Sequence, residues 1–149
     1  MTIQFTIPGK PQGKARPRFN GKSGQVYTPQ STRDYEELIR RCYTQSSSKR
    51  MKFLETLPGT LSLRINAYFQ VPKSWSVVKK QCALRGEIKP TVKPDIDNIA
   101  KIILDALNGV AYKDDAAIIG LMVIKYYTMQ EPYVNVQICN NLLDASWFT

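Results

Sequence analysis

Apolar residues recur along the chain with two periods, one of two residues and one between three and four. The period of two is clearest over residues 61–71, where Leu, Ile, Ala, Phe and Val alternate with polar residues, so this segment is predicted to be a strand with one buried face. Residues 2–8 are a second predicted strand. Two more are predicted near residues 117–127 and over 133–139, close enough in sequence to pair antiparallel.

Three segments have the period of a helix. Residues 30–45 carry apolar residues at i, i+3, i+4 and i+7, and their start contains a candidate capping box, Ser31-x-x-Asp34. Ser74 is a candidate cap for a helix over residues 75–84, whose predicted inner face is Trp75, Val78 and Cys82. Residues 96–107 form the third predicted helix, which Asn108 and Gly109 end and whose apolar stripe is Ile96, Ile99, Ala100, Ile103 and Leu107.

This mixture of strands and helices, without strict βαβ repetition, predicts an α+β fold with helices packed on a mixed sheet. The chain has 149 residues and 43% hydrophobic residues, which predicts one domain over residues 1–149. The longest strongly apolar run, residues 116–124, is less than half of the about 20 residues that cross a bilayer, so no membrane partner is expected. The cysteines are Cys42, Cys82 and Cys139, an odd and widely spaced set that predicts buried thiols in a reducing, cytoplasmic protein.

The chain contains no histidine, which excludes several classes of site. Ser-His-Asp and Cys-His catalysis, histidine-ligated zinc and histidine general bases all require an imidazole. Any hydrolytic activity must therefore rely on carboxylates, Lys, Tyr or water activated by a metal ion.

The charge is concentrated at the N-terminal end. The net charge is +9, and residues 1–52 hold 11 Lys and Arg against three Asp and Glu. Within them, residues 10–19 combine four cations with two prolines and a glycine, which predicts an extended surface loop. Such a basic segment is typical of a nucleic-acid-binding surface, although it is also compatible with a merely soluble one. The candidate DNA contacts are Lys10, Lys14, Arg16 and Arg18.

Acidic residues gather in one later segment of this basic chain. Five of the nine acidic residues after position 52 lie between Asp95 and Asp115. Asp97, Lys101 and Asp105 are spaced i, i+4 and i+8, so they share one helix face opposite the isoleucine stripe. These side chains could simply cap a helix and form surface ion pairs.

The alternative interpretation is a divalent-metal site. Mg²⁺ binds through one or two carboxylates together with water and phosphate oxygens, so two aspartates at a helix start and a third from a nearby turn suit it. A bound ion can neutralise a phosphate and lower the pKa of an attacking water, and Lys101 can stabilise the transition state. A basic binding loop beside acidic metal ligands is the arrangement that a nuclease needs.

Residues 93–115 resemble the signature of the RusA family of Holliday-junction resolvases, which phages and prophages often carry. Lys14 to Phe19 and Thr28-Pro29 also resemble the phage branch of this family. The core of the signature reads Asp95-Ile-Asp97-Asn98-Ile-Ala-Lys101-Ile-Ile-Leu-Asp105-Ala-Leu, and an Asp-Asp pair follows at positions 114 and 115.

The resemblance implies a RusA-like fold and a homodimeric, Mg²⁺-dependent endonuclease that cuts two strands of a four-way DNA junction, with Mn²⁺ as a substitute ion. By position in the motif, the essential acidic residues are Asp95, Asp97 and Asp115, the essential lysine is Lys101, and Asp114 is the other member of the acidic pair. We therefore expect the three essential carboxylates to converge on one ion. Two alternatives remain: a non-catalytic basic nucleic-acid-binding module, and a nuclease for flaps, forks or RNA.

Overall fold

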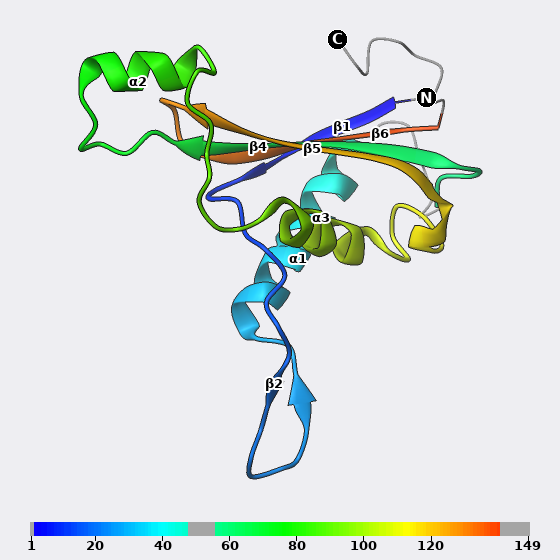
Figure 1. Cartoon of the computed structure of the whole chain (residues 1–149). Helices are drawn as coiled ribbons and strands as arrows, with labels where there is room; N and C mark the ends of the chain where they lie inside the picture. The colour runs from blue at the N-terminus through cyan, green and yellow to red at the C-terminus, as the bar shows by residue number, and fades with distance from the viewer. Residues whose placement is uncertain (1, 48–55, 141–149) are drawn as a thin grey trace.

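A four-stranded sheet with two helices against one face organises the protein (Figure 1). The structure, a computed structural model, describes residues 2–47 and 56–140. In chain order the elements are β1 (Thr2–Pro8), β2 (Arg18–Phe19), β3 (Val26–Tyr27), α1 (Gln30–Ser47), β4 (Leu61–Gln70), α2 (Val77–Leu84), α3 (Ile96–Leu107), the 3-10 turn η1 (Asp115–Ala117), β5 (Ile118–Thr128) and β6 (Tyr133–Cys139).

The sheet is mixed, with the strand order β1-β6-β4-β5. β4 pairs in parallel with β5 on one side and antiparallel with β6 on the other, while β1 pairs antiparallel with β6. α1 and α3 lie together below one face, and α2 lies near the other face at one end (Figure 1). The predicted α+β class, a mixed sheet with packed helices, is confirmed.

The predicted pairing of the last two strands is wrong. β4 lies between β5 and β6, so the short connection after Thr128 crosses the end of β4 instead of forming a hairpin. The alternate residues of β4 are almost completely buried, and its backbone needs hydrogen-bond partners along both edges. A central position satisfies both requirements, and nearness in sequence could not reveal it.

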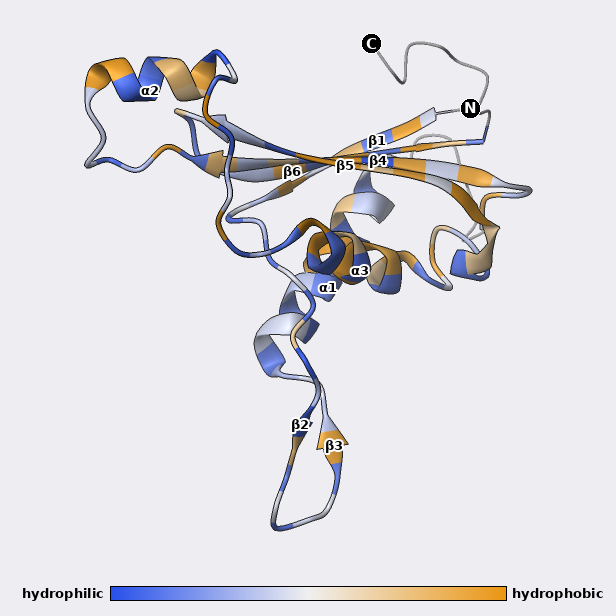
Figure 2. Cartoon of the chain, viewed as in Figure 1, coloured by the Kyte–Doolittle hydropathy of each residue, from blue (hydrophilic) through white to orange (hydrophobic). Residues whose placement is uncertain are grey.

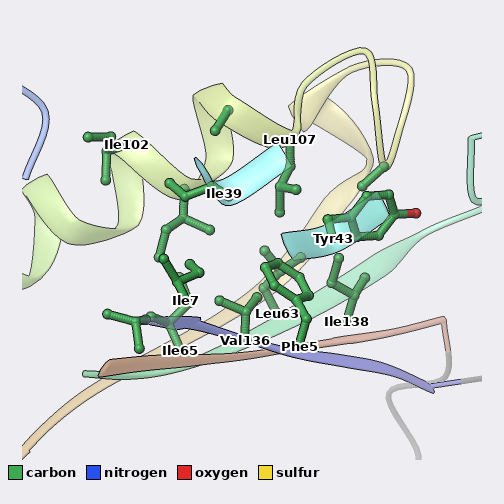
Figure 3. Close-up of a cluster of buried hydrophobic side chains, with 14 of the residues drawn as sticks. Phe5, Ile7, Ile39, Tyr43, Leu63, Ile65, Ile102, Leu107, Val136 and Ile138 are labelled. Atoms are coloured by element: carbon green, nitrogen blue, oxygen red, sulfur yellow. The ribbon is translucent and has the colours of Figure 1, made fainter. Parts of the chain in front are cut away.

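The core lies between the sheet and the helix pair (Figure 3). Cross-strand neighbours such as Ile65 and Val136 point to the same face, because residues in register share a side of the sheet. α1 contributes Ile39 and Tyr43, and the Tyr43 ring packs edge-on against Phe5 with 5.8 Å between ring centroids. This packing fixes the position of α3 relative to the sheet.

α3 occupies residues 96–107 as predicted, and four residues of the predicted stripe are buried, but the buried face lacks Ile96 and also includes Ile102 and Ala106. Ile96 is 53% exposed, whereas Ile102 is completely buried. The first residue of a helix lies at the rim of a packed interface, so Ile96 projects beyond the sheet while the following turns bury their isoleucines. The hydropathy colouring shows that α3 contains both strongly apolar and strongly hydrophilic residues (Figure 2).

The other two predicted helices differ at their starts. α1 begins at Gln30, which places Ser31 inside the first turn rather than at a cap. α2 is capped by Ser76, whose hydroxyl accepts a hydrogen bond from the backbone N–H of Lys79, so Ser74 is not its cap. Val78 is 69% exposed and not on an inner face, because α2 buries only Ala83.

The basic loop contains a feature that its composition did not indicate. β2 and β3 pair antiparallel and project from the body as a narrow ribbon (Figure 1), which we call the β2–β3 arm, residues 18–27. The Asn20 side chain accepts hydrogen bonds from the backbone N–H groups of Lys22 and Ser23 at the tip. Across the described ranges, no helix combines the length and apolar character needed to cross a membrane.

We predict that Ile103→Ala lowers the free energy of unfolding by about 2–5 kcal/mol, because it leaves a cavity at a completely buried position. Ile96→Ala is the matched control on the same helix, and it should cost less than about 1 kcal/mol because its side chain is mostly exposed. Urea unfolding followed by circular dichroism measures both. Equal losses for the two variants would contradict the assigned buried face.

Candidate active site on the exposed face of helix α3

The acidic segment lies on the side of α3 that faces away from the sheet. Asp97 and Lys101 are exposed and Asp105 is half-buried, while the residues between them pack into the core. The predicted i, i+4, i+8 face therefore exists because burial of the isoleucines turns these three side chains outward. Asp97 also lies in the first turn, where the helix dipole favours a negative charge.

Asp95 occupies the N-cap position of α3 but makes no side-chain capping hydrogen bond. Its carboxylate instead accepts a hydrogen bond from Lys93, with 2.6 Å between Oδ2 and Nζ. The Asp95 side chain is 45% exposed. Capping therefore does not account for this carboxylate, and the ion pair leaves much of it accessible.

Asp114 and Asp115, the acidic pair after α3, have different surroundings. Asp114 caps η1, because its Oδ1 accepts a hydrogen bond of 2.8 Å from the backbone N–H of Ala116. Asp115 is exposed, and its pKa is raised above the usual range, first by a hydrogen bond to the Asp114 carboxyl and then by desolvation and the charges of Asp114 and Asp105. The turn thus places Asp115 close enough to Asp114 and Asp105 to be repelled by both.

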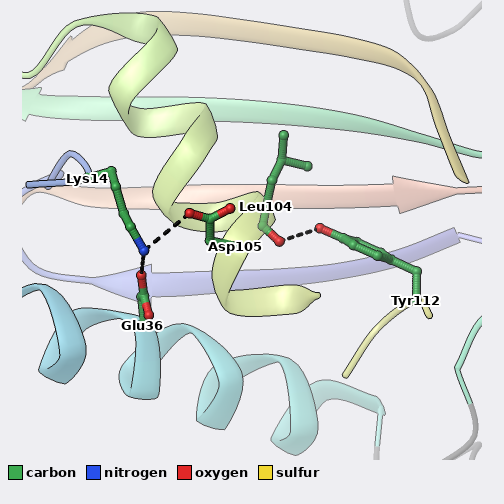
Figure 4. A network of polar contacts seen from close by, with 5 residues as sticks. All are labelled: Lys14, Glu36, Leu104, Asp105 and Tyr112. Carbon is green, nitrogen blue, oxygen red and sulfur yellow. Dashed lines mark hydrogen bonds and ion pairs between the residues drawn. The ribbon is translucent and has the colours of Figure 1, made fainter. Parts of the chain in front are cut away.

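Tyr112 lies just before this turn in sequence and connects it to α3. Its ring is completely buried, and its hydroxyl donates a hydrogen bond of 2.7 Å to the carbonyl of Leu104 (Figure 4). Burial raises the Tyr112 pKa, and the negative charges of Asp115 and Asp105 raise it further. The neutral phenol therefore ties the segment before η1 to the last turns of α3.

The predicted site carboxylates fall into two groups. Asp95 and Asp97 lie at the start of α3, whereas Asp115 lies with Asp114 near Asp105, and eight residues of helix separate Asp97 from Asp105 by about 12 Å. Within residues 2–47 and 56–140, no three carboxylate or thiol side chains are arranged to hold one metal ion. The expected convergence of Asp95, Asp97 and Asp115 on one ion is therefore not seen in this arrangement.

Lys14 holds the basic loop against the exposed side of α3 that carries Asp97 and Asp105, which we call the acidic face. Its ammonium group donates a hydrogen bond to Glu36 of α1 and lies 3.2 Å from Oδ2 of Asp105 on α3 (Figure 4). Burial opposes protonation of Lys14, but the hydrogen bonds to both carboxylates and their charges outweigh it, so its pKa is raised. Lys14 is thus committed to holding two helices and a loop together.

The main chain of the loop also touches α3. The backbone N–H of Lys14 donates a hydrogen bond of 3.1 Å to the carbonyl of Asn98. A Cβ at Gly13 would lie 2.9 Å from the Cβ atoms of both Asn98 and Pro94, closer than real Cβ contacts come, so only glycine fits this approach. The other three candidate DNA contacts are exposed along or beside this loop: Lys10, Arg16 and Arg18.

Sequence reasoning missed Lys125, which lies behind the Asp95 segment. Its ammonium group donates a hydrogen bond to the carbonyl of Val92 and lies 5.1 Å from the centroid of the Phe69 ring. Desolvation lowers the Lys125 pKa, and the charge of Asp95 opposes this effect. The available signal was a single charged residue in the otherwise uncharged segment that became β5.

Comparison with known proteins covers nearly all of these elements. A protein-family model described as "Endodeoxyribonuclease RusA" matches residues 8–139. The chain is also 34% identical over 140 residues to "Uncharacterized protein YqaN" of Bacillus subtilis (strain 168), a match that spans 91% of this chain and 94% of that protein. The family match includes the basic loop, all of α3 and the acidic pair.

We predict that Asp114→Asn lowers the pKa of Asp115 in metal-free protein, because it removes the neighbouring carboxylate while Asn retains the ability to cap η1. Because the Asp115 pKa is raised in the folded state, the free energy of unfolding falls as pH rises through the pKa of Asp115 in the folded protein. In Asp114→Asn this loss of stability with rising pH should be smaller. Nuclear magnetic resonance titration of the carboxyl carbons measures the shift. Asp34→Asn on α1 is the control, and an unchanged Asp115 pKa in both variants would contradict the assigned repulsion.

Proposed function

The chain belongs to the RusA family of endodeoxyribonucleases, whose members act on Holliday junctions, and from that membership we propose that it resolves four-way DNA junctions by Mg²⁺-dependent phosphodiester hydrolysis in recombination and repair. The observation that carries the proposal is the family match across residues 8–139, because it includes both surfaces of the candidate site. The arrangement of those surfaces provides independent physical support.

The first support is the contact between opposite charges. The acidic face of α3 borders the basic loop through Lys14, so a bound DNA backbone and a bound cation would lie next to each other. Carboxylates alone repel a phosphodiester, and a basic loop alone cannot activate water. Side by side, the two surfaces can bind a DNA backbone and a cation that activates water.

By position in the family motif, we propose Asp95, Asp97 and Asp115 as the metal ligands, although in this arrangement Asp115 lies apart from Asp95 and Asp97 and the three do not meet at one ion. All three offer carboxylate oxygens, the ligands that Mg²⁺ prefers, and Mn²⁺ accepts the same donors. Asp115 lies close enough to Asp114 and Asp105 for their charges to raise its pKa, and a nearby cation would relieve that repulsion. When bound, such an ion would supply neutralisation of the phosphate and activation of water.

The chain's own residues supply the remaining functions. Lys101 is exposed one helical turn after Asp97, where its ammonium group can stabilise negative charge that develops on the phosphate. Lys10, Arg16 and Arg18 bind the DNA backbone, and Lys14 contributes by holding the loop in place. A homodimer would place two identical sites on a substrate with two-fold symmetry, which two coordinated cuts require.

We predict that Asp97→Asn retains junction binding and loses cleavage by at least 100-fold, because it removes one charged oxygen ligand while preserving the shape of the side chain. The assay compares cleavage of a labelled four-way junction, a flap and a linear duplex at matched Mg²⁺ or Mn²⁺ concentrations. Asp34→Asn, an exposed aspartate on α1, is the control and should cleave like the wild type. An active Asp97→Asn enzyme would defeat the site assignment, and a wild type that cuts no nucleic acid would favour the non-catalytic binding module.

We predict that Arg16→Gln combined with Arg18→Gln weakens junction binding and reduces the slope of log affinity against log salt by about 0.9 for each lost phosphate contact. Lys73→Gln combined with Lys79→Gln is the control, because these exposed lysines lie near α2, away from α3 (Figure 1). Fluorescence anisotropy across a salt series measures both pairs. Identical slopes for the two pairs would place the DNA on another surface.

A further inference from the structure

The β2–β3 arm has two chemically different faces. Phe19 pairs with Val26 and Arg18 pairs with Tyr27, and paired residues in a two-stranded ribbon point to the same side. One side is therefore apolar, and the other combines a cation with an aromatic ring. Phe19 and Val26 are each 68% exposed, and the arm extends away from the sheet and both of its covering helices (Figures 1 and 2).

A two-stranded ribbon of this kind cannot bury its own apolar side. Two paired strands alone are marginally stable in water and gain stability when an apolar face is covered. Phe19 and Val26 are adjacent across the ribbon and form a continuous surface rather than scattered single residues. A contiguous exposed apolar surface on a projecting element indicates a site of interaction.

The charge of the arm identifies the kind of partner. Residues 1–33 contain no Asp or Glu, and Arg16, Arg18 and Lys22 lie on the arm or at its base. A partner that covers this element meets several positive charges and no negative charge on it. DNA fits such an element, because phosphates bind the cations and the flat face of a base pair can stack on the aromatic side chain.

The base of the arm is held at a fixed place beside the candidate active site. Lys14 is bound to Glu36 and Asp105, and Gly13 packs against Pro94 and Asn98, only a few residues before β2. The tip is ordered by the backbone hydrogen bond between the Asn20 N–H and the carbonyl of Gln25, 2.8 Å long. The arm therefore extends from the acidic face rather than from a distant part of the molecule.

We propose that the apolar face of the β2–β3 arm, Phe19 and Val26, stacks on the base pair exposed at the branch point of a DNA junction and thereby distinguishes branched from continuous DNA. Base pairs inside a continuous duplex are covered on both sides by their neighbours, so they offer no flat surface to the arm. A branch point interrupts the stack and exposes one. This inference rests on the proposed junction substrate and adds the element that recognises the branch.

The test measures binding of Phe19→Ala to a four-way junction and to a linear duplex of the same sequence, without divalent metal so that no cleavage occurs. Loss of one stacked aromatic side chain should weaken junction binding about 5- to 150-fold and change duplex binding by less than about twofold. Phe19→Tyr, which keeps a ring, should bind the junction like the wild type. Phe19 is mostly exposed, so the variant should fold, and circular dichroism verifies this.

Val26→Ala and Val77→Ala provide a matched pair of variants. The two valines are 68% and 70% exposed, but Val77 lies on α2. Val26→Ala should lower the preference for the junction over the duplex, and Val77→Ala should leave it unchanged. The same change of preference in both variants would contradict a specific role for the arm.

The remaining outcomes are also decisive. Equal weakening of junction and duplex binding by Phe19→Ala would make the arm a general DNA contact and overturn the inference. Unchanged binding to both would overturn it as well, and a shift in sedimentation coefficient would then assign the apolar face to a second copy of the chain. A wild type that shows no preference for junctions would refute the proposed function itself. If the wild type cleaves junctions and Phe19→Ala has the same preference for junction over duplex as the wild type, only the role of the arm is refuted.

Discussion

Burial of the apolar side of α3 against the sheet is the constraint on which the rest of the site depends. Ile99, Ile102 and Ile103 are completely buried, so the helix has only one rotation that satisfies its core contacts. That rotation turns Asp97 and Lys101 outward. The chemistry of the exposed side is thus positioned by side chains that never contact a substrate.

A second level of organisation joins the acidic face to the basic loop. Lys14 contacts one carboxylate on α1 and one on α3, so a single ammonium group links three segments that are distant in sequence (Figure 4). The partly buried cation beside these two carboxylates also reduces the repulsion that they would otherwise exert on DNA. The same contacts hold the loop, with its exposed cations, against this face.

Sequence reasoning located the elements better than their arrangement. α3 and its polar face followed from local periodicity, and the predicted bounds of β1 and β6 match the structure. The central position of β4 depends on long-range pairing, which no local pattern encodes. The roles of Lys14 and Lys125 were missed for the same reason, because their partners lie on other elements. The separation of Asp95 from Asp115 likewise depends on how the turn after α3 folds back.

The order of strands also determines when the site can exist during folding. α3 and η1 lie on the crossover between β4 and β5, and Asp115 lies three residues before Ile118, the residue of β5 that pairs with Leu61. Parallel pairing across so long a connection requires the closure of a large loop and forms late. A nascent chain therefore carries its basic loop long before the turn that holds Asp114 and Asp115 is folded into place beside α3.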